Sequence, residues 1–155
     1  MGETRKLRYA IIGAGMAGIL AGIKLKERGE QFTIYEKADK LGGTWRENRY
    51  PGLTCDVPAH AYTYSFEPYP DWDAYYSTGA QIQTYFEYVA DKYGITPTIR
   101  FGHEVTSAIY NDATATWTLT FGNGSSVEAD VVIAASGVLH HPKLPDIAGL
   151  DTFKG

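Results

Sequence analysis

The most constraining feature of this chain is a glycine-rich turn between a short apolar run and a helix-like stretch. The turn reads Gly13-Ala14-Gly15-Met16-Ala17-Gly18 and directly follows the apolar residues 9–12. This is the G-x-G-x-x-G pattern in the strand–turn–helix setting that it requires. Gly13 permits a tight turn, Gly15 leaves room for a phosphate beside the backbone, and Gly18 lets the helix lie close to the strand. The free N–H groups and partial positive charge at the helix start favour an anion.

A carboxylate completes the pattern. Glu36 stands 18 residues after Gly18 and closes the next apolar run, residues 32–35. An acid at this place accepts hydrogen bonds from ribose hydroxyls and repels a 2′-phosphate. The glycine pattern alone would be weak evidence. Strand, helix and acid together predict an adenine dinucleotide site that takes NAD or FAD and disfavours NADP.

The hydrophobic periodicity predicts an α/β fold with a parallel sheet. Strands are expected at residues 7–12 and 31–35, on either side of a helix at 16–28 whose apolar face contains Ile19 and Ile23. This β-α-β order implies a right-handed crossover. A second helix is expected at residues 79–92, with Thr78 as its cap and Gly94 after its end. Three further strands are expected at residues 105–110, 116–121 and 126–134.

The later strands predict a Rossmann-like domain with a small β-meander. Gly122-Asn123-Gly124 is typical of a hairpin turn. The run Val131 to Ser136 is apolar almost throughout, so the last strand is expected to be parallel and buried on both faces. Residues 38–76 form a long aromatic-rich excursion with little periodicity, and such stretches are usually functional or linking. We expect residues 1–155 to form one dinucleotide-binding portion.

Composition excludes several other classes of protein. The chain has 155 residues and a net charge of −4, so no general attraction to nucleic acid or an anionic membrane is expected. No apolar run approaches the roughly 20 residues that span a bilayer, and no signal-peptide pattern is found. Cys55 is the only cysteine, which fits a reduced, cytoplasmic setting. The histidines lack metal-ligand spacing, and no metal site is expected.

Four short segments carry a family resemblance. Leu41-Gly42-Gly43-Thr44-Trp45 follows Glu36, and Asn48-Arg49-Tyr50-Pro51-Gly52 and Cys55-Asp56 come next in order, before Tyr62-Thr63-Tyr64-Ser65-Phe66. Together with the glycine turn, the chain resembles the N-terminal FAD-binding part of class B flavoprotein monooxygenases, most closely the Baeyer–Villiger monooxygenases. In that family NADPH reduces the flavin, and oxygen is inserted beside the carbonyl of a ketone or transferred to a heteroatom, while the protein orients the cofactor.

The resemblance implies roles for particular residues. Asp56 would be the catalytic residue, close to both flavin and nicotinamide. The glycine turn would hold the FAD pyrophosphate, Glu36 the ribose and Val105 the adenine, while Trp45 would lie near the flavin and Tyr62 would contact the FAD. The full set implied to bind the cofactor is Gly13, Ala14, Gly15, Met16, Ala17, Gly18, Glu36, Lys37, Gly43, Thr44, Trp45, Asp56, Tyr62, Val105 and Ala135.

Two departures from the family pattern limit this interpretation. The family often has Arg two residues before the Asp, whereas Thr54 stands there, so a cationic NADP contact at that position is in doubt. The chain ends at Phe153-Lys154-Gly155, which looks like the opening of a longer family fingerprint. We therefore expect a chain truncated relative to the family, without the NADPH domain and inactive alone, whose fold the rest of the parent enzyme completes. Another flavoprotein oxidoreductase or a non-catalytic FAD- or NAD-binding fragment remains an alternative.

Two other functions for residues of this region, a nucleophile–base pair and a substrate channel, are less favoured. Cys55 with His60 has the composition of a nucleophile–base pair, but no orienting third group is evident, and a buried thiol is the usual role. The aromatic residues between Tyr62 and Tyr93 are suited either to line a substrate channel or to pack an irregular segment. We favour packing.

Overall fold

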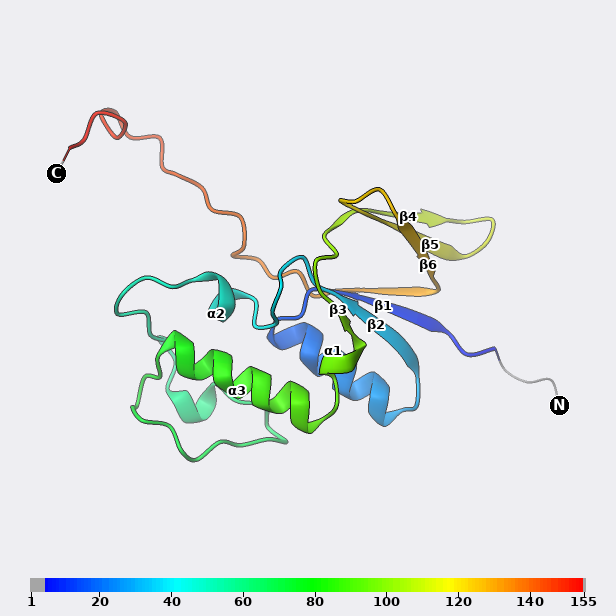
Figure 1. Cartoon of the computed structure of the whole chain (residues 1–155), viewed down its shortest axis with the longest axis horizontal. Helices are drawn as coiled ribbons and strands as arrows, with labels where there is room; N and C mark the ends of the chain where they lie inside the picture. The colour runs from blue at the N-terminus through cyan, green and yellow to red at the C-terminus, as the bar shows by residue number, and fades with distance from the viewer. Residues whose placement is uncertain (1–4, 155) are drawn as a thin grey trace.

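The computed structural model describes residues 5–154, so Gly155 of the expected F-x-G ending lies outside the described residues. Two sheets form the framework (Figure 1). The first is parallel, with strand order β3-β2-β1-β7, and the second is antiparallel, with order β4-β5-β6. The strands are β1 (Arg8–Ile12), β2 (Gln31–Tyr35), β3 (Ile99–Arg100), β4 (Val105–Asn111), β5 (Thr116–Phe121), β6 (Ser126–Ala129) and β7 (Val131–Ala134).

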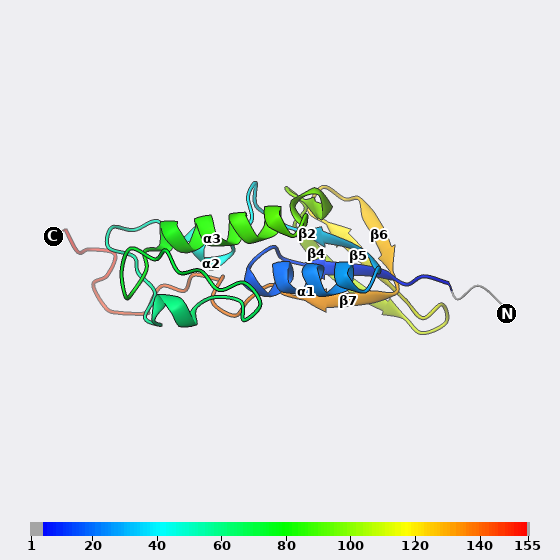
Figure 2. The same ribbon diagram turned by 90° about the horizontal axis from the view of Figure 1, so that it is seen from below.

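The predicted β-α-β unit is confirmed. Helix α1 (Met16–Glu27) connects β1 to β2, which pair in parallel from Arg8↔Gln31 to Ile12↔Tyr35. Ile19 and Ile23 of α1 are fully buried in the core cluster that also contains Ile11 and Ile34 of the parallel sheet. Figure 2 shows α1 lying along the parallel sheet. The 3.6-residue spacing of its apolar side chains therefore determines which face of the helix is covered.

Helix α3 (Gly79–Lys92) has the predicted bounds and the predicted cap. The hydroxyl of Thr78 accepts a hydrogen bond from the backbone N–H of Gln81, at 3.3 Å. This bond satisfies one of the free donors at the helix start. The apolar face of α3 joins α1 and the parallel sheet in one core, through Ile82, Tyr85, Phe86 and Val89.

The expected single strand at residues 126–134 is wrong, because it is two strands in different sheets. Ala129 pairs with Trp117 in the antiparallel sheet, and Val131 pairs with Tyr9 in the parallel sheet. Asp130 lies at the junction, where its carboxylate accepts hydrogen bonds from the backbone and guanidinium of Arg8. These bonds hold the chain at the point where it passes from one sheet to the other.

Burial of the last strand on both faces is also wrong. Strand β7 is parallel, as predicted, but it is an edge strand, because its recorded partner is β1 alone among the described residues. Val131, Val132 and Ile133 are half-buried, and Ala134 is exposed. The side chains of an edge strand have a neighbouring strand on one flank only, so they are covered less completely than those of a central strand.

The long excursion after β2 is largely irregular, as predicted, but contains short elements that the sequence did not indicate. These are helix α2 (Thr44–Glu47) and a 3₁₀ turn, Ala59–Ala61. A second 3₁₀ turn, Thr96–Thr98, leads into the two-residue strand β3. Helices α2 and α3 and the excursion lie toward one end of the molecule, away from the antiparallel sheet (Figure 1).

Candidate functional site

The glycine turn is built from backbone groups in close contact. Gly13 has φ +99° and donates its N–H to the carbonyl of Tyr35 at 2.8 Å. A Cβ added at Gly13 would lie 2.7 Å from the carbonyl oxygen of Ala135. A Cβ added at Gly18 would lie 1.9 Å from the carbonyl oxygen of Gly13. Only glycine fits these two positions, because neither backbone oxygen can move away without breaking the turn.

The start of α1 presents donors suited to an anion. The first helical bond runs from the N–H of Ile19 to the carbonyl of Gly15, at 3.0 Å. Within residues 5–154, no acceptor is recorded for the N–H groups of Gly15, Met16 and Ala17. Free N–H groups at a helix start carry a partial positive charge and bind phosphates. The arrangement therefore fits a pyrophosphate.

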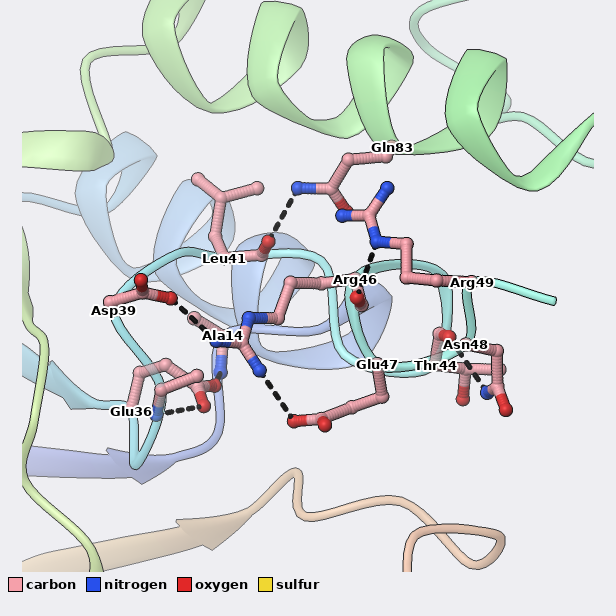
Figure 3. Close-up of polar contacts among 11 residues, drawn as sticks. Ala14, Glu36, Asp39, Leu41, Thr44, Arg46, Glu47, Asn48, Arg49 and Gln83 are labelled. Carbon is pink, nitrogen blue, oxygen red and sulfur yellow. Dashed lines mark hydrogen bonds and ion pairs between the residues drawn. The ribbon is translucent and has the colours of Figure 1, made fainter.

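Glu36 lies against this turn, at the end of β2. Its carboxylate is buried, accepting a hydrogen bond from the N–H of Ala14 at 2.7 Å and from that of Ala38 at 2.9 Å. Figure 3 shows the side chain directed at Ala14. Each carboxylate oxygen has a second lone pair that can accept a hydroxyl. The N–H of Ala14 is thus used to orient Glu36, and the neighbouring N–H groups remain for a phosphate.

The Gly42–Trp45 segment is joined directly to the turn. Gly42 donates its N–H to the carbonyl of Ala14, at 2.9 Å. A Cβ added at Gly43 would lie 3.1 Å from the Cα of Gly15, so the two backbones approach closely there. Gly43 has φ +55° and immediately precedes α2. The structure therefore brings together two sequence motifs that are separated by a strand and a helix.

Trp45 and Tyr62 form a second pair of predicted residues that meet. The indole Nε1 of Trp45 donates to the hydroxyl of Tyr62 at 3.0 Å, and the rings cross edge to face with centroids 5.6 Å apart. Burial raises the pKa of the Tyr62 phenol, the Trp45 bond lowers it, and Cys55 and Asp56 raise it further. Tyr62 is therefore protonated at neutral pH, and its O–H remains available as a donor.

The other predicted residues differ in how they contact the turn and the Trp45–Tyr62 pair. Ala135 contacts the turn through its carbonyl and through its N–H, which donates to Ile12 at 2.9 Å. Lys37, Thr44 and Asp56 are exposed, and no polar side-chain contact is recorded for Lys37 or Asp56 in the described part of the chain. Val105 is half-buried at the start of β4, in the smaller core cluster between the two sheets.

Several residues that support the site were not predicted. Gln83 of α3 donates to the carbonyl of Leu41 at 2.6 Å, and the hydroxyl of Tyr64 donates to the carbonyl of Met16 at 2.7 Å. Arg46 of α2 pairs with Asp39 and Glu47 (Figure 3). The sequence signal that could have indicated this support is the polar residue Gln83 beside the apolar face of its helix.

The weaker alternatives receive no structural support. Cys55 is buried and free, and its sulfur accepts from the N–H of Val57 at 3.4 Å. Across residues 5–154 no group of three His, Cys, Asp or Glu side chains is placed to hold a metal. The aromatic residues pack on one another, with Tyr64 stacked on Phe66 and Trp72 against Tyr85, in agreement with the packing interpretation.

No helix in the described part of the chain combines the length and the apolar character needed to cross a membrane.

The turn, the parallel sheet and Glu36 define a Rossmann-like dinucleotide-binding fold, and residues 11–78 match the family of NAD(P)-binding Rossmann-like domains. The chain is 43% identical over 150 residues to a Baeyer–Villiger monooxygenase of Streptomyces coelicolor, covering 96% of this chain and 29% of that protein. It is 44% identical over 158 residues to an FAD-binding monooxygenase of Aspergillus terreus, covering 97% of this chain and 28% of that one.

A crystal structure of cyclohexanone monooxygenase in an open form has the same fold. Its TM-score is 0.87 at 39% identity, covering 98% of this chain and 31% of the other. The expected resemblance to Baeyer–Villiger monooxygenases is thus confirmed. The chain spans a little under a third of the length of the relatives that it matches.

Proposed function

We propose that this chain binds FAD and forms part of a flavin-dependent monooxygenase that oxidises ketones to esters or lactones with NADPH and O₂, in a reduced cytoplasmic setting. The observation that carries the proposal is the buried Glu36 carboxylate beside a glycine turn whose N–H groups at Gly15, Met16 and Ala17 have no acceptor recorded within residues 5–154. The similarity to monooxygenases named as Baeyer–Villiger and FAD-binding supports this choice of reaction and cofactor. The nicotinamide cofactor would bind mainly outside these 155 residues.

Each part of the site has a proposed task. The N–H groups of Gly15, Met16 and Ala17 bind the pyrophosphate, and Glu36 accepts from the adenosine ribose. Moving the Glu36 side chain would break its hydrogen bonds with the N–H groups of Ala14 and Ala38, which costs free energy. The carboxylate is therefore held in place before the cofactor binds. FAD, when bound, supplies the redox chemistry.

The Trp45–Tyr62 pair is proposed to meet the flavin end of the cofactor. Its edge-to-face packing and hydrogen bond hold both side chains in one orientation. The further contacts proposed are those of Gly13, Ala14, Gly18, Lys37, Gly43, Thr44, Val105 and Ala135. Asp56 is proposed as the catalytic residue of this region, since its exposed carboxylate can hold a cationic group beside the flavin.

The absorbance spectrum of the purified protein, followed by extraction of any bound nucleotide, tests the proposal. Bound FAD would support it, and bound NAD would overturn it. Glu36→Ala should lower FAD affinity by about tenfold or more, because a charge-assisted contact to the ribose is lost. Glu30→Ala, at the half-buried acid just before β2, is the matched control and should bind as the wild type does.

The 155-residue chain alone is expected to show no NADPH-driven oxygenation of a ketone. The sequence contains one glycine turn of the dinucleotide type, and the proposal assigns this turn to FAD. NADPH consumption measured together with ester formation checks this expectation. Sustained coupled turnover by the 155-residue chain would contradict it.

A further inference from the structure

We infer that Gln83 is a positioning residue for the flavin-proximal part of the FAD site, which it serves by holding the Leu41–Trp45 turn. The inference rests on the proposed function. Gln83 lies on α3 and is 5% exposed. Its side chain reaches a turn that is 42 residues away in the sequence (Figure 3).

The orientation of the Gln83 amide follows from its two partners. Nε2 donates to the carbonyl of Leu41 at 2.6 Å and to the Glu87 carboxylate at 2.9 Å. Both partners can only accept, so the NH₂ group must face them. Oε1 therefore faces Gly42, where an added Cβ would lie only 1.7 Å from it.

Contact with Gln83 restricts the backbone of Gly42 strongly. Gly42 has φ +122°, a conformation that favours glycine. Its N–H is bonded to the carbonyl of Ala14, and the next residue, Gly43, lies against the Cα of Gly15. The Leu41–Trp45 turn thus lies between Gln83 on one side and the glycine turn of residues 13–18 on the other.

Gln83 Oε1 is buried without a hydrogen-bond partner among the described residues. A buried unpaired oxygen destabilises a fold, and an apolar side chain of the same length would avoid that cost. The hydrogen bonds of Nε2 to Leu41 and Glu87 explain the polar side chain at this position, while the contact of Oε1 with Gly42 is steric. The ion pairs of Arg46 cannot substitute for them, since Arg46 lies toward the surface, where such pairs contribute little.

Comparing FAD with ADP separates positioning from general damage to the fold. ADP carries the adenosine and pyrophosphate but no flavin. We expect Gln83→Met to lower FAD affinity about tenfold, to alter the visible circular dichroism of bound flavin, and to leave ADP affinity within about twofold. Gln81→Met on the same helix, whose amide accepts from Ser77, is the matched control and should change neither.

Amide hydrogen exchange of the ligand-free chain tests the positioning independently of FAD. Exchange of the Gly42 and Trp45 N–H groups should accelerate in Gln83→Met and in a second variant, Gln83→Glu, which cannot donate to Leu41 when ionised. Unchanged exchange there, or an equal loss of FAD and ADP affinity, would overturn the inference. Faster exchange in a chain that binds no FAD would support the positioning of the turn and overturn the proposed function instead.

Discussion

The β-α-β unit of residues 8–36 and the irregular segment of residues 38–78 are held in place by different kinds of contact. In the first, backbone packs on backbone, as where Gly13, Gly18 and Ala135 meet. In the second, side chains of α3 bond to the backbone of the excursion. Tyr85 accepts from the N–H of Tyr64 at 2.9 Å and donates to the carbonyl of Glu67 at 2.7 Å.

This difference determines which substitutions destabilise each region. A backbone contact tolerates no added atom, so the glycine turn is sensitive to a single methyl group. A buried polar contact tolerates a change of shape but not the loss of a partner, so the excursion is sensitive to deletion of one hydroxyl or amide. The two regions meet at Gly15 and Gly43, where the proposed cofactor site lies.

The largest effect is expected for Gly18→Ala. The added methyl carbon would lie 1.9 Å from the carbonyl oxygen of Gly13, and relieving that clash must separate α1 from β1. We expect the free energy of unfolding to fall by about 3 kcal/mol, measured by urea denaturation. Gly15→Ala is the matched variant, because its Cβ would make only ordinary contact at 3.6 Å. A similar loss of stability in both variants would contradict the distinction between the two glycines.

In the second region the largest effect is expected for Tyr85→Phe. Tyr85 is 1% exposed, and loss of its hydroxyl leaves the N–H of Tyr64 and the carbonyl of Glu67 without this partner. The free energy of unfolding should fall by about 2 kcal/mol, measured by thermal and urea denaturation. Tyr88 is 43% exposed, and Tyr88→Phe, which removes a hydroxyl that donates to the Glu67 carboxylate, should cost less. An equal cost for the two tyrosines would show that burial does not govern this contact.

The same contrast explains what the sequence could predict. The bounds of α3 and β2 were predicted correctly, because caps and periodicity are local signals. Glu36 was singled out as a site residue by its spacing from Gly18 at the end of a predicted strand, and the structure places it beside the turn. The support from Gln83 and Tyr85 was missed, because their partners lie 18 to 42 residues away. The change of sheet at Asp130 was missed because both flanking segments have strand-like composition.

The dependence of stability on pH compares one carboxylate in each region, Glu67 in the excursion and Asp130 beside β1. The hydrogen bond from Lys92 lowers the pKa of Glu67 in the excursion, and the one from Arg8 lowers the pKa of Asp130 beside β1. A carboxylate whose pKa is lower folded than unfolded stabilises the fold above its unfolded pKa, about 4. That stabilisation is lost as pH falls through the folded pKa.

We therefore expect stability to decrease below about pH 4, by less than for Tyr85→Phe, since the side chains of the basic partners are 43% and 48% exposed. Urea denaturation from pH 7 to pH 3 measures the slope. Glu67→Gln and Asp130→Asn should each make that slope shallower. If neither variant alters it, these two carboxylates do not control acid unfolding.

The smallest effect is expected at a contact that joins the two regions across the surface. Lys24 of α1 lies with Nζ 4.6 Å from the ring centroid of Phe66 and 2.9 Å from the Glu27 carboxylate. Lys24 is exposed and Phe66 is half-buried, so Lys24→Ala should lower the free energy of unfolding by only about 0.5–1 kcal/mol. Glu27→Ala removes the ion pair and leaves the contact with Phe66. Because that contact belongs to both regions, Lys24→Ala should also accelerate amide exchange in the excursion, whereas Glu27→Ala should not. Identical exchange in the two variants would show that Lys24 stabilises α1 alone.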